Sequence, residues 1–341
     1  MNLKEQFQFP YIKRFYFARF ISNFGNGMSP IALAFGILNL PDGDANMLGL
    51  VLGSTTVAML IMSPFGGVLA DKFGRVKAVA FADLVGSAGL FVQVAFFATG
   101  DVPLIVLLLV NINFGLMWGI FWPAMSGVLP ALVPDEHLQG TNSVNNFFSN
   151  GAIILGAAVG GIIVAGWGAT WALAIDAATF TIGGIVLLTF RHVSPASGKT
   201  ENTMIDDLIH GWKLFLSFRW IVIGVFGFSF IVLAWAAGEN ILGPLIALKE
   251  FNGAKSWSLV LTFEGIGLLL GSVIGLKIKL KYPLRFLLII SFSISLYMWS
   301  MAKPQSIWFI AFCALLWGIT LDLWITIWST AMAREVPREA L

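Results

Sequence analysis

The stretch that decides the fold is Gly67-Val68-Leu69-Ala70-Asp71-Lys72-Phe73-Gly74-Arg75-Val76-Lys77, which lies between apolar runs at 47–70 and 77–99. Each run has roughly the 20 apolar residues that a helix needs to cross a bilayer. A glycine at position 74 permits a tight reversal of the chain, and the charged residues around it belong outside hydrocarbon. The pattern therefore predicts two membrane helices joined by a short, charged turn.

The composition of the whole chain also indicates a protein that is embedded in a lipid bilayer. Of the 341 residues, 58% are hydrophobic and 11% are charged, against about 25% charged in a typical soluble domain. A soluble protein of this size has too little interior to hide so many apolar side chains. We therefore expect the lipid bilayer as a partner. The net charge of +2 gives no sign of nucleic acid.

The residues that usually hold metals or cofactors are scarce. Cys313 is the single cysteine, which excludes a disulfide framework and a cysteine metal site. The three histidines, at positions 137, 192 and 210, fall in polar connections. We expect no metal site and no cofactor.

Ten stretches are long and apolar enough to cross a membrane. The predicted spans are 15–40, 47–70, 77–99, 102–131, 143–166, 168–190, 219–248, 257–276, 284–302 and 305–333. The sequence therefore predicts an all-α integral membrane protein.

Lysine and arginine set the orientation, because they accumulate on the cytoplasmic side of membrane helices. With the N-terminus in the cytoplasm, sixteen of them fall inside and three outside. The three outer residues are Lys249, Lys255 and Lys303. We expect a multi-pass protein of a bacterial inner membrane with a cytoplasmic N-terminus.

A polar segment divides the chain. It predicts three parts: a six-helix bundle at 1–190, a cytoplasmic linker at 191–218, and a partial four-helix bundle at 219–341. Within the linker, Met204–Phe218 places Leu208, Trp212 and Phe215 on one face, as in an amphipathic helix on a membrane surface. A plain linker with a short helix is the alternative.

The two halves resemble each other. Val133-Pro134-Asp135-Glu136-His137-Leu138 follows a span with Trp118-Gly119, and Val336-Pro337-Arg338-Glu339-Ala340-Leu341 follows a span with Trp317-Gly318. In the first half, two more spans come after this element. We therefore expect a parent of six plus six helices, of which this C-terminally truncated chain carries ten. Duplicated halves with a substrate site between them are common among secondary transporters.

Three motifs resemble a known family. The 67–77 loop resembles the signature loop of the major facilitator superfamily. Gly156-Ala157-Ala158-Val159-Gly160-Gly161 is similar to its antiporter signature, with Ala157 in place of proline. Segments 17–25 and 122–124 resemble the branch of enterobactin exporters and macrolide efflux pumps. The resemblance implies a bundle of twelve helices that works as an exporter.

The resemblance also implies roles for the motif residues. Those of the loop form an inner gate: Gly67, Asp71, Lys72, Gly74, Arg75 and Lys77. Asp71 can accept hydrogen bonds from Arg75 or from a helix N-terminus, and in the family it docks against the eleventh helix. Gly156, Gly160 and Gly161 let two helices approach closely, for which ordinary packing is an alternative reading.

Ionisable residues inside a membrane are costly and usually functional. Six of those within the predicted spans are candidates for function: Arg19, Asp83, Asp176, Glu239, Glu264 and Asp322. Arg19 and Asp83 lie near inner ends and are candidates for pairing or gating. Glu264 or Glu239 is the first candidate for a proton carrier, and Asp322 is the next. For each acid, pairing with another helix is the alternative.

Aromatic residues are candidates for a substrate pocket. Trp118, Trp122 and Trp235 could line a pocket for flat, amphipathic molecules, although tryptophan also forms belts at membrane interfaces. We expect a monomer that exports such molecules, drugs or siderophores, in exchange for protons. A facilitator or importer of a small solute and an inactive fragment are the alternatives. No Gly-x-x-x-x-Gly-Lys-Ser/Thr, Gly-x-Ser-x-Gly or zincin string occurs, so an enzyme is not expected.

Overall fold

The computed structural model describes residues 7–193, 212–275, 283–304 and 306–335, without the side chains of 283–284 and 329–335. All regular secondary structure in these ranges is helical, which confirms the predicted all-α class. The chain divides into two compact units, Met1–Glu201 and Asn202–Leu341. The predicted amphipathic helix lies mostly outside the described residues, although 212–217 is helical.

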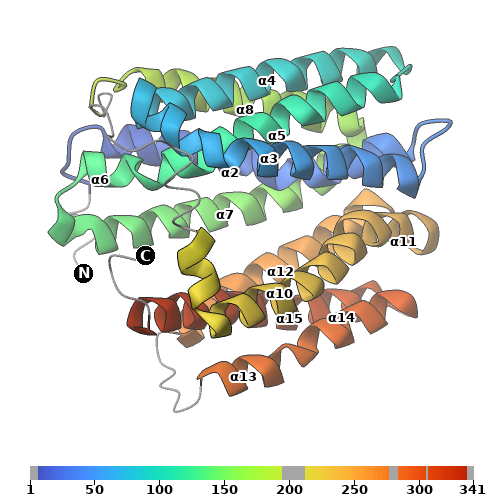
Figure 1. Ribbon diagram of the computed structural model, residues 1–341. Coiled ribbons are helices and arrows are strands. Elements are labelled where there is room, and N and C mark those ends of the chain that lie inside the picture. Colours follow the sequence, from blue (N-terminus) through green and yellow to red (C-terminus); the bar gives the residue numbers. More distant parts are fainter. Residues whose placement is uncertain (1–6, 194–211, 276–282, 305, 336–341) are drawn as a thin grey trace. The chain divides into compact units, whose positions relative to one another are not determined.

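The first unit contains six long helices and one short one (Figure 1). They are α2 (Ile12–Leu38), α3 (Ala45–Phe73), α4 (Arg75–Thr99), α5 (Leu104–Ser126), α6 (Val128–Leu132), α7 (Asp135–Trp167) and α8 (Ala169–Leu188). The predicted span at 102–131 is interrupted at Gly127, which ends α5 and precedes α6. Within this unit α2 packs against α7 and α8, and α3 packs against α5.

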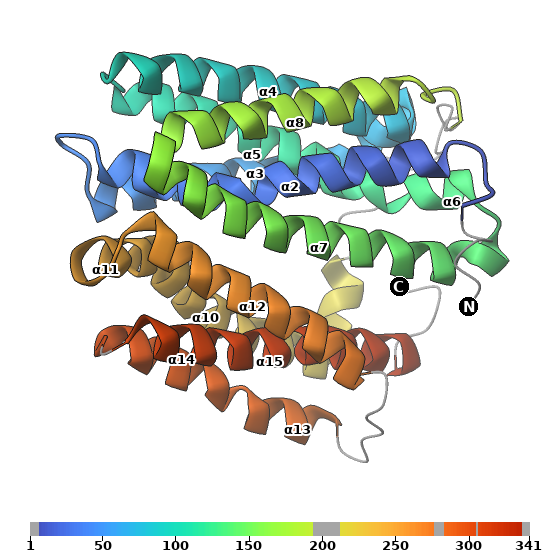
Figure 2. The same cartoon turned by 180° about the vertical axis from the view of Figure 1, so that it is seen from behind.

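The second unit contains both continuous and interrupted helices (Figure 2). They are α10 (Arg219–Ala237), η1 (Gly238–Leu242), α11 (Gly243–Glu250), α12 (Ala254–Gly275), α13 (Pro283–Ile290), α14 (Phe292–Ala302) and α15 (Ile307–Glu335). The predicted span at 219–248 thus contains a wide π-helical turn, η1. The span at 284–302 is divided near Ser291 into α13 and α14.

Nine helices of the described ranges are long and apolar enough to cross a membrane. The first of the ten predicted spans, at 15–40, corresponds to α2, and α2 is not among these nine helices. It carries Lys13, Arg14 and Arg19, and it buries much of its length against α7 and α8. In contrast, Ile221 is the buried residue of α10, and Phe230 and Ile223 are largely exposed, as expected of side chains that face lipid.

Glycines bring the helices of the first unit into backbone contact. A Cβ on Gly156 of α7 would collide with the Phe24 carbonyl oxygen of α2, and one on Gly27 would collide with the Ile153 carbonyl oxygen of α7. Lipid gives apolar helices little reason to associate, so close packing at small residues has to hold them together.

The same contact recurs in both halves, at the glycine of each Trp-Gly pair. In α5, Gly119 lies against the backbone of α3, with the Met59 carbonyl oxygen 2.8 Å from the position that a Cβ would take. In α15, Gly318 lies against the Glu264 carbonyl oxygen of α12. The repeated dipeptide therefore marks equivalent helix crossings.

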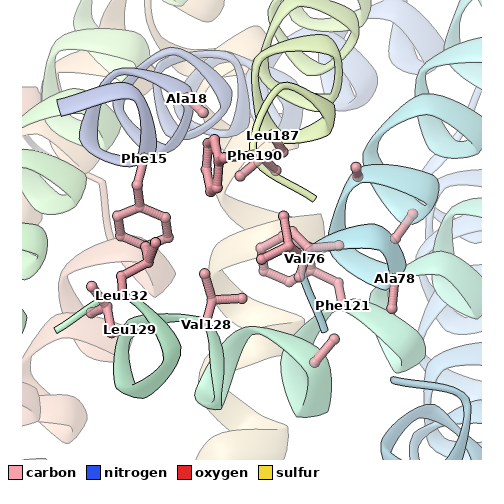
Figure 3. Close-up of a cluster of buried hydrophobic side chains, with 14 of the residues drawn as sticks. Phe15, Ala18, Val76, Ala78, Phe121, Val128, Leu129, Leu132, Leu187 and Phe190 are labelled. Atoms are coloured by element: carbon pink, nitrogen blue, oxygen red, sulfur yellow. The ribbon is translucent and has the colours of Figure 1, made fainter. Parts of the chain in front are cut away.

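A hydrophobic cluster closes one end of the first unit (Figure 3). Phe15 of α2, Phe121 of α5 and Phe190 after α8 point into it, and the short helix α6 adds Val128 and Leu132. Val76, which follows the α3–α4 turn, belongs to the same cluster, so the apolar side chains of α6 cover the end of the bundle at which that turn lies.

Gly318→Ala should lower the free energy of unfolding by about 1–3 kcal/mol, because its Cβ would meet backbone atoms of Glu264 and Leu268 that cannot move aside. Gly227→Ala on α10 is the matched control, since a Cβ there meets nothing within 4 Å. Thermal unfolding of both variants in detergent micelles measures the difference. Equal melting temperatures would contradict the backbone contact.

Candidate functional site

Glu239 lies in the wide turn η1 between α10 and α11. The Gly243 N–H donates to the carbonyl of Gly238, five residues earlier, instead of four. Pro244 has no N–H to donate, so the regular ladder is already broken here. Such π-turns are common at functional sites, and this one brings Glu239 into the interior of its unit, where the side chain is buried.

The carboxylate of Glu239 accepts hydrogen bonds from two aromatic residues. The indole Nε1–H of Trp235 donates to Glu239 Oε2 at 2.7 Å. The hydroxyl of Tyr297, on α14, donates to the same oxygen at 3.4 Å. Both donors are fixed by their helices, so the acid is oriented from two sides.

Glu264 of α12 completes the pair. Its carboxyl group lies close to that of Glu239, and both residues are 6% exposed. An ionised carboxylate can only accept a hydrogen bond. The two groups can therefore bond to each other only while one of them holds a proton.

Three further side chains extend the site, and sequence reasoning missed them. Tyr297 and Ser300 lie on α14, and Cys313 lies on α15, where it is buried close to Ser300. Ser300 donates to the Tyr297 carbonyl at 2.7 Å. One signal was available: Tyr297 is one of only four tyrosines, and it lies in the middle of an apolar span.

The pair belongs to the second unit alone. Gly119 lies against the Met59 carbonyl where α5 crosses α3, and Gly318 lies against the Glu264 carbonyl where α15 crosses α12. By this comparison, Met59 is the residue of the first unit that corresponds to Glu264 in the second. The duplicated helices therefore carry a methionine in one half and an acid in the other. In the described ranges, no group of three or more His, Cys, Asp or Glu residues could hold a metal ion.

Asp322 lies elsewhere on the same helix pair. It accepts a hydrogen bond from Ser272 at 2.8 Å, and its Cβ lies beside Gly271. Since Gly271 is two turns beyond Glu264 on α12, Asp322 is about 10 Å along the helix from the pair. The structure therefore does not bring this candidate together with Glu239 and Glu264.

The ionisable candidates of the first unit are buried separately. The guanidinium of Arg19 donates to Asn23 at 3.1 Å and lies over the ring of Phe121 at 4.7 Å. Asp83 of α4 is buried near it, but their charged atoms are more than 4.0 Å apart. Asp176 of α8 is buried against Gly25 of α2.

The charged loop contains the expected local ion pair. Arg75 donates to Asp71 Oδ1 at 3.2 Å, and both side chains are partly exposed. Gly74 has φ of 94°, which glycine adopts without strain. The arginine also lies against Gly127, where a Cβ would collide with it. Lys72 and Lys77 are exposed, and Gly67 faces Pro123 of α5.

The remaining candidates separate into packing and surface residues. Gly156, Gly160 and Gly161 are buried, and the first two meet the backbone of α2. Trp118 and Trp122 contact each other at 6.1 Å, but Trp122 is 57% exposed. Trp235 alone of the three tryptophans contacts the acid pair.

Trp235→Phe should lower the free energy of unfolding by about 1 kcal/mol, because it removes the 2.7 Å hydrogen bond to Glu239. Tyr297→Phe should cost only a few tenths, since its bond is longer, at 3.4 Å. Trp299→Phe, at an exposed position of α14, controls for lost indole area. Thermal unfolding of the three variants checks this order, and the reverse order would contradict it.

Comparisons with known proteins agree with this architecture. Residues 15–341 match the sequence model of the Major Facilitator Superfamily. The chain is 25% identical over 247 residues to the uncharacterized MFS-type transporter YfiS of Bacillus subtilis, covering 70% of this chain and 57% of YfiS. It is 24% identical over 224 residues to the putative bacilysin exporter BacE of the same species, covering 64% and 54%.

A third relative is the enterobactin exporter EntS of Salmonella typhimurium, 25% identical over 279 residues, covering 80% of this chain and 65% of EntS. The chain thus spans between 54% and 65% of the length of these three relatives.

Solved structures share the fold. A mutant of the nucleoside transporter NupG superposes with a TM-score of 0.78 at 15% identity, covering 97% of this chain and 85% of that one. A bacterial homologue of the iron transporter ferroportin gives 0.68 at 16% identity, covering 99% and 86%. With the family match extending over residues 15–341, the chain belongs to the Major Facilitator Superfamily.

Proposed function

We propose that this protein is a secondary active transporter that exports small, amphipathic molecules in exchange for protons. It works as a monomer in a bacterial inner membrane by alternating access. The single observation that carries the proposal is the close approach of two buried carboxyl groups, those of Glu239 and Glu264.

This pair is suited to exchange a proton. Loss of that proton would leave two negative charges in contact away from water, where their repulsion is strong. The carboxyl groups would then have to separate or attract water. Glu239 lies in the wide turn beside α11, and Glu264 lies on α12. Release of the proton is therefore coupled to separation of this turn from α12.

The proton gradient supplies enough free energy for export. One charge that crosses a membrane potential of 100 mV yields about 2.3 kcal/mol. At about 1.4 kcal/mol per tenfold ratio, that supports a substrate gradient of roughly fiftyfold. One proton per substrate is therefore sufficient for useful efflux.

Two observations support the direction and the class of substrate. Relatives named as exporters of bacilysin and enterobactin align with most of the chain. In addition, Trp235 contacts the acid pair, and Trp317 lies 6.3 Å from Trp235 between ring centroids. Flat aromatic rings next to a polar group suit a molecule with an apolar body and a polar end.

The first experiment measures proton movement in proteoliposomes with a lumenal pH dye and a panel of lipophilic drugs and catecholate siderophores. We expect substrate-driven proton flux from the unmodified protein, loss of at least about tenfold in Glu264→Gln and Glu239→Gln, and no change in Glu250→Gln. Glu250 is the matched control because it ends α11 and is exposed.

The other outcomes separate the alternatives. Substrate transport without proton flux, equal in all variants, would show a facilitator or importer and would refute the role of the pair. If the chain moves nothing, the same assay on a longer form with two further helices tests whether it is an inactive fragment. Proton-coupled transport by the longer form alone would restrict the proposed function to that form.

The proposed orientation rests on the distribution of Lys and Arg. In a Cys313→Ser background, a cysteine at Asp101 should react with an impermeant maleimide added to intact cells, and a cysteine at Asp135 should react only after lysis. Both residues are exposed. The opposite labelling pattern would place the N-terminus outside.

A further inference from the structure

Three of the buried polar atoms that lack partners in the first unit belong to neighbouring residues of α2 and α4. They are Arg19 Nη1, Ser22 Oγ and Asp83 Oδ2, and none forms a hydrogen bond in the described part of the chain. Arg19 is 5% exposed, Asp83 2% and Ser22 0%. A buried group without a partner costs free energy, so three of them at one place need an explanation.

The three atoms converge between α2, α4 and α8. Ser22 Oγ and Asp83 Oδ2 both lie beside Gly183 of α8, where an added Cβ would collide with the first and lie 3.6 Å from the second. Arg19 is three residues before Ser22, and thus on the same face of α2. Its charge interacts with that of Asp83.

The arginine and the aspartate nevertheless do not touch. Their charged atoms are more than 4.0 Å apart. Arg19 is held where it is, because Nη2 donates to Asn23 at 3.1 Å and the guanidinium lies 4.7 Å from the centre of the Phe121 ring.

The partnerless atoms define what fits between them. Nη1 can only donate, the ionised carboxylate can only accept, and a hydroxyl can do either. Since one positive and one negative charge already cancel, an additional ion would unbalance the site. A water molecule accepts from Nη1, donates to Oδ2 and has a bond left for Ser22, within the two to four partners that buried waters make.

We propose that one internal water molecule occupies this site and bridges Arg19 and Asp83, with Ser22 as its third partner. The water joins α2 to α4 beside α8, and it lets two opposite charges remain in the membrane interior without direct contact. Two helices of the first unit, α2 and α4, are thereby tied by one polar junction.

The direction in which Ser22→Ala changes the stability of the protein distinguishes a dry site from a hydrated one. In a dry site the variant removes an unsatisfied hydroxyl and should be as stable as the unmodified protein or more stable. In a hydrated site it removes a partner of the water, and we expect the melting temperature of the full chain in detergent micelles to fall by about 2–4 °C. Ser63→Ala is the control, because Ser63 bonds to the Met59 carbonyl of its own helix at 2.8 Å.

Infrared difference spectroscopy identifies the water itself. The difference between unmodified protein and Ser22→Ala should contain an O–H stretching band that shifts when H₂¹⁸O replaces ordinary water. The difference for Ser63→Ala should contain none. The proposal is overturned if Ser22→Ala does not lower the melting temperature relative to the control, or if no band responds to ¹⁸O.

Discussion

Backbone contact between helices at glycines is the constraint on which the rest of the structure depends. In lipid, apolar side chains gain little by leaving their surroundings, so helices associate through close packing and polar contacts. Gly27 and Gly156 bring α2 against α7, and Gly318 brings α15 against α12. Without a Cβ at these crossings, the carbonyl of one helix lies where the side chain of its neighbour would otherwise be. Such contacts fix the helix register, and with it the depth at which every polar side chain enters the bundle.

The buried acids of the second unit depend on that register. Glu264 contributes its own backbone carbonyl to the Gly318 crossing, so the residue that carries the carboxyl group is also a packing point. Glu239, in contrast, lies in a wide turn whose backbone is already interrupted before Pro244. One member of the pair is therefore set on a rigid crossing and the other on a segment that can change its winding. In the proposed mechanism, loss of the proton would therefore move η1, while the contact between α12 and α15 stays intact.

Much of the fold could be predicted from the sequence, because a membrane helix needs a long apolar run that is easy to recognise. The apolar runs, the charged 67–77 turn and the distribution of Lys and Arg predicted the helical class and ten spans. Nine helices of the described ranges are long and apolar enough to cross a membrane, and three of the predicted spans are interrupted, at Gly127, at η1 and near Ser291. The sequence also singled out Glu239 and Glu264, since an acid in an apolar run stands out by itself. It did not predict their contact, because pairing across helices depends on the rotation of each helix about its axis. Ser300 and Cys313 were missed for a related reason, since such residues are tolerated inside a membrane and do not stand out.

The comparison between the halves explains why the Glu239–Glu264 pair is found in one half only. Met59 and Glu264 occupy equivalent positions at equivalent crossings, so a duplicated scaffold accepts either an apolar or an acidic residue there. The first unit instead places its charges as Arg19 and Asp83, opposite in sign and held close to neutrality. The Glu239–Glu264 pair has no such counter-charge among its hydrogen-bond partners, which are a tryptophan and a tyrosine. On the proposed mechanism, loss of the proton leaves two like charges in contact in the second unit, whereas Arg19 and Asp83 of the first unit keep opposite charges. The proposed response of this contact to protons therefore belongs to the second unit.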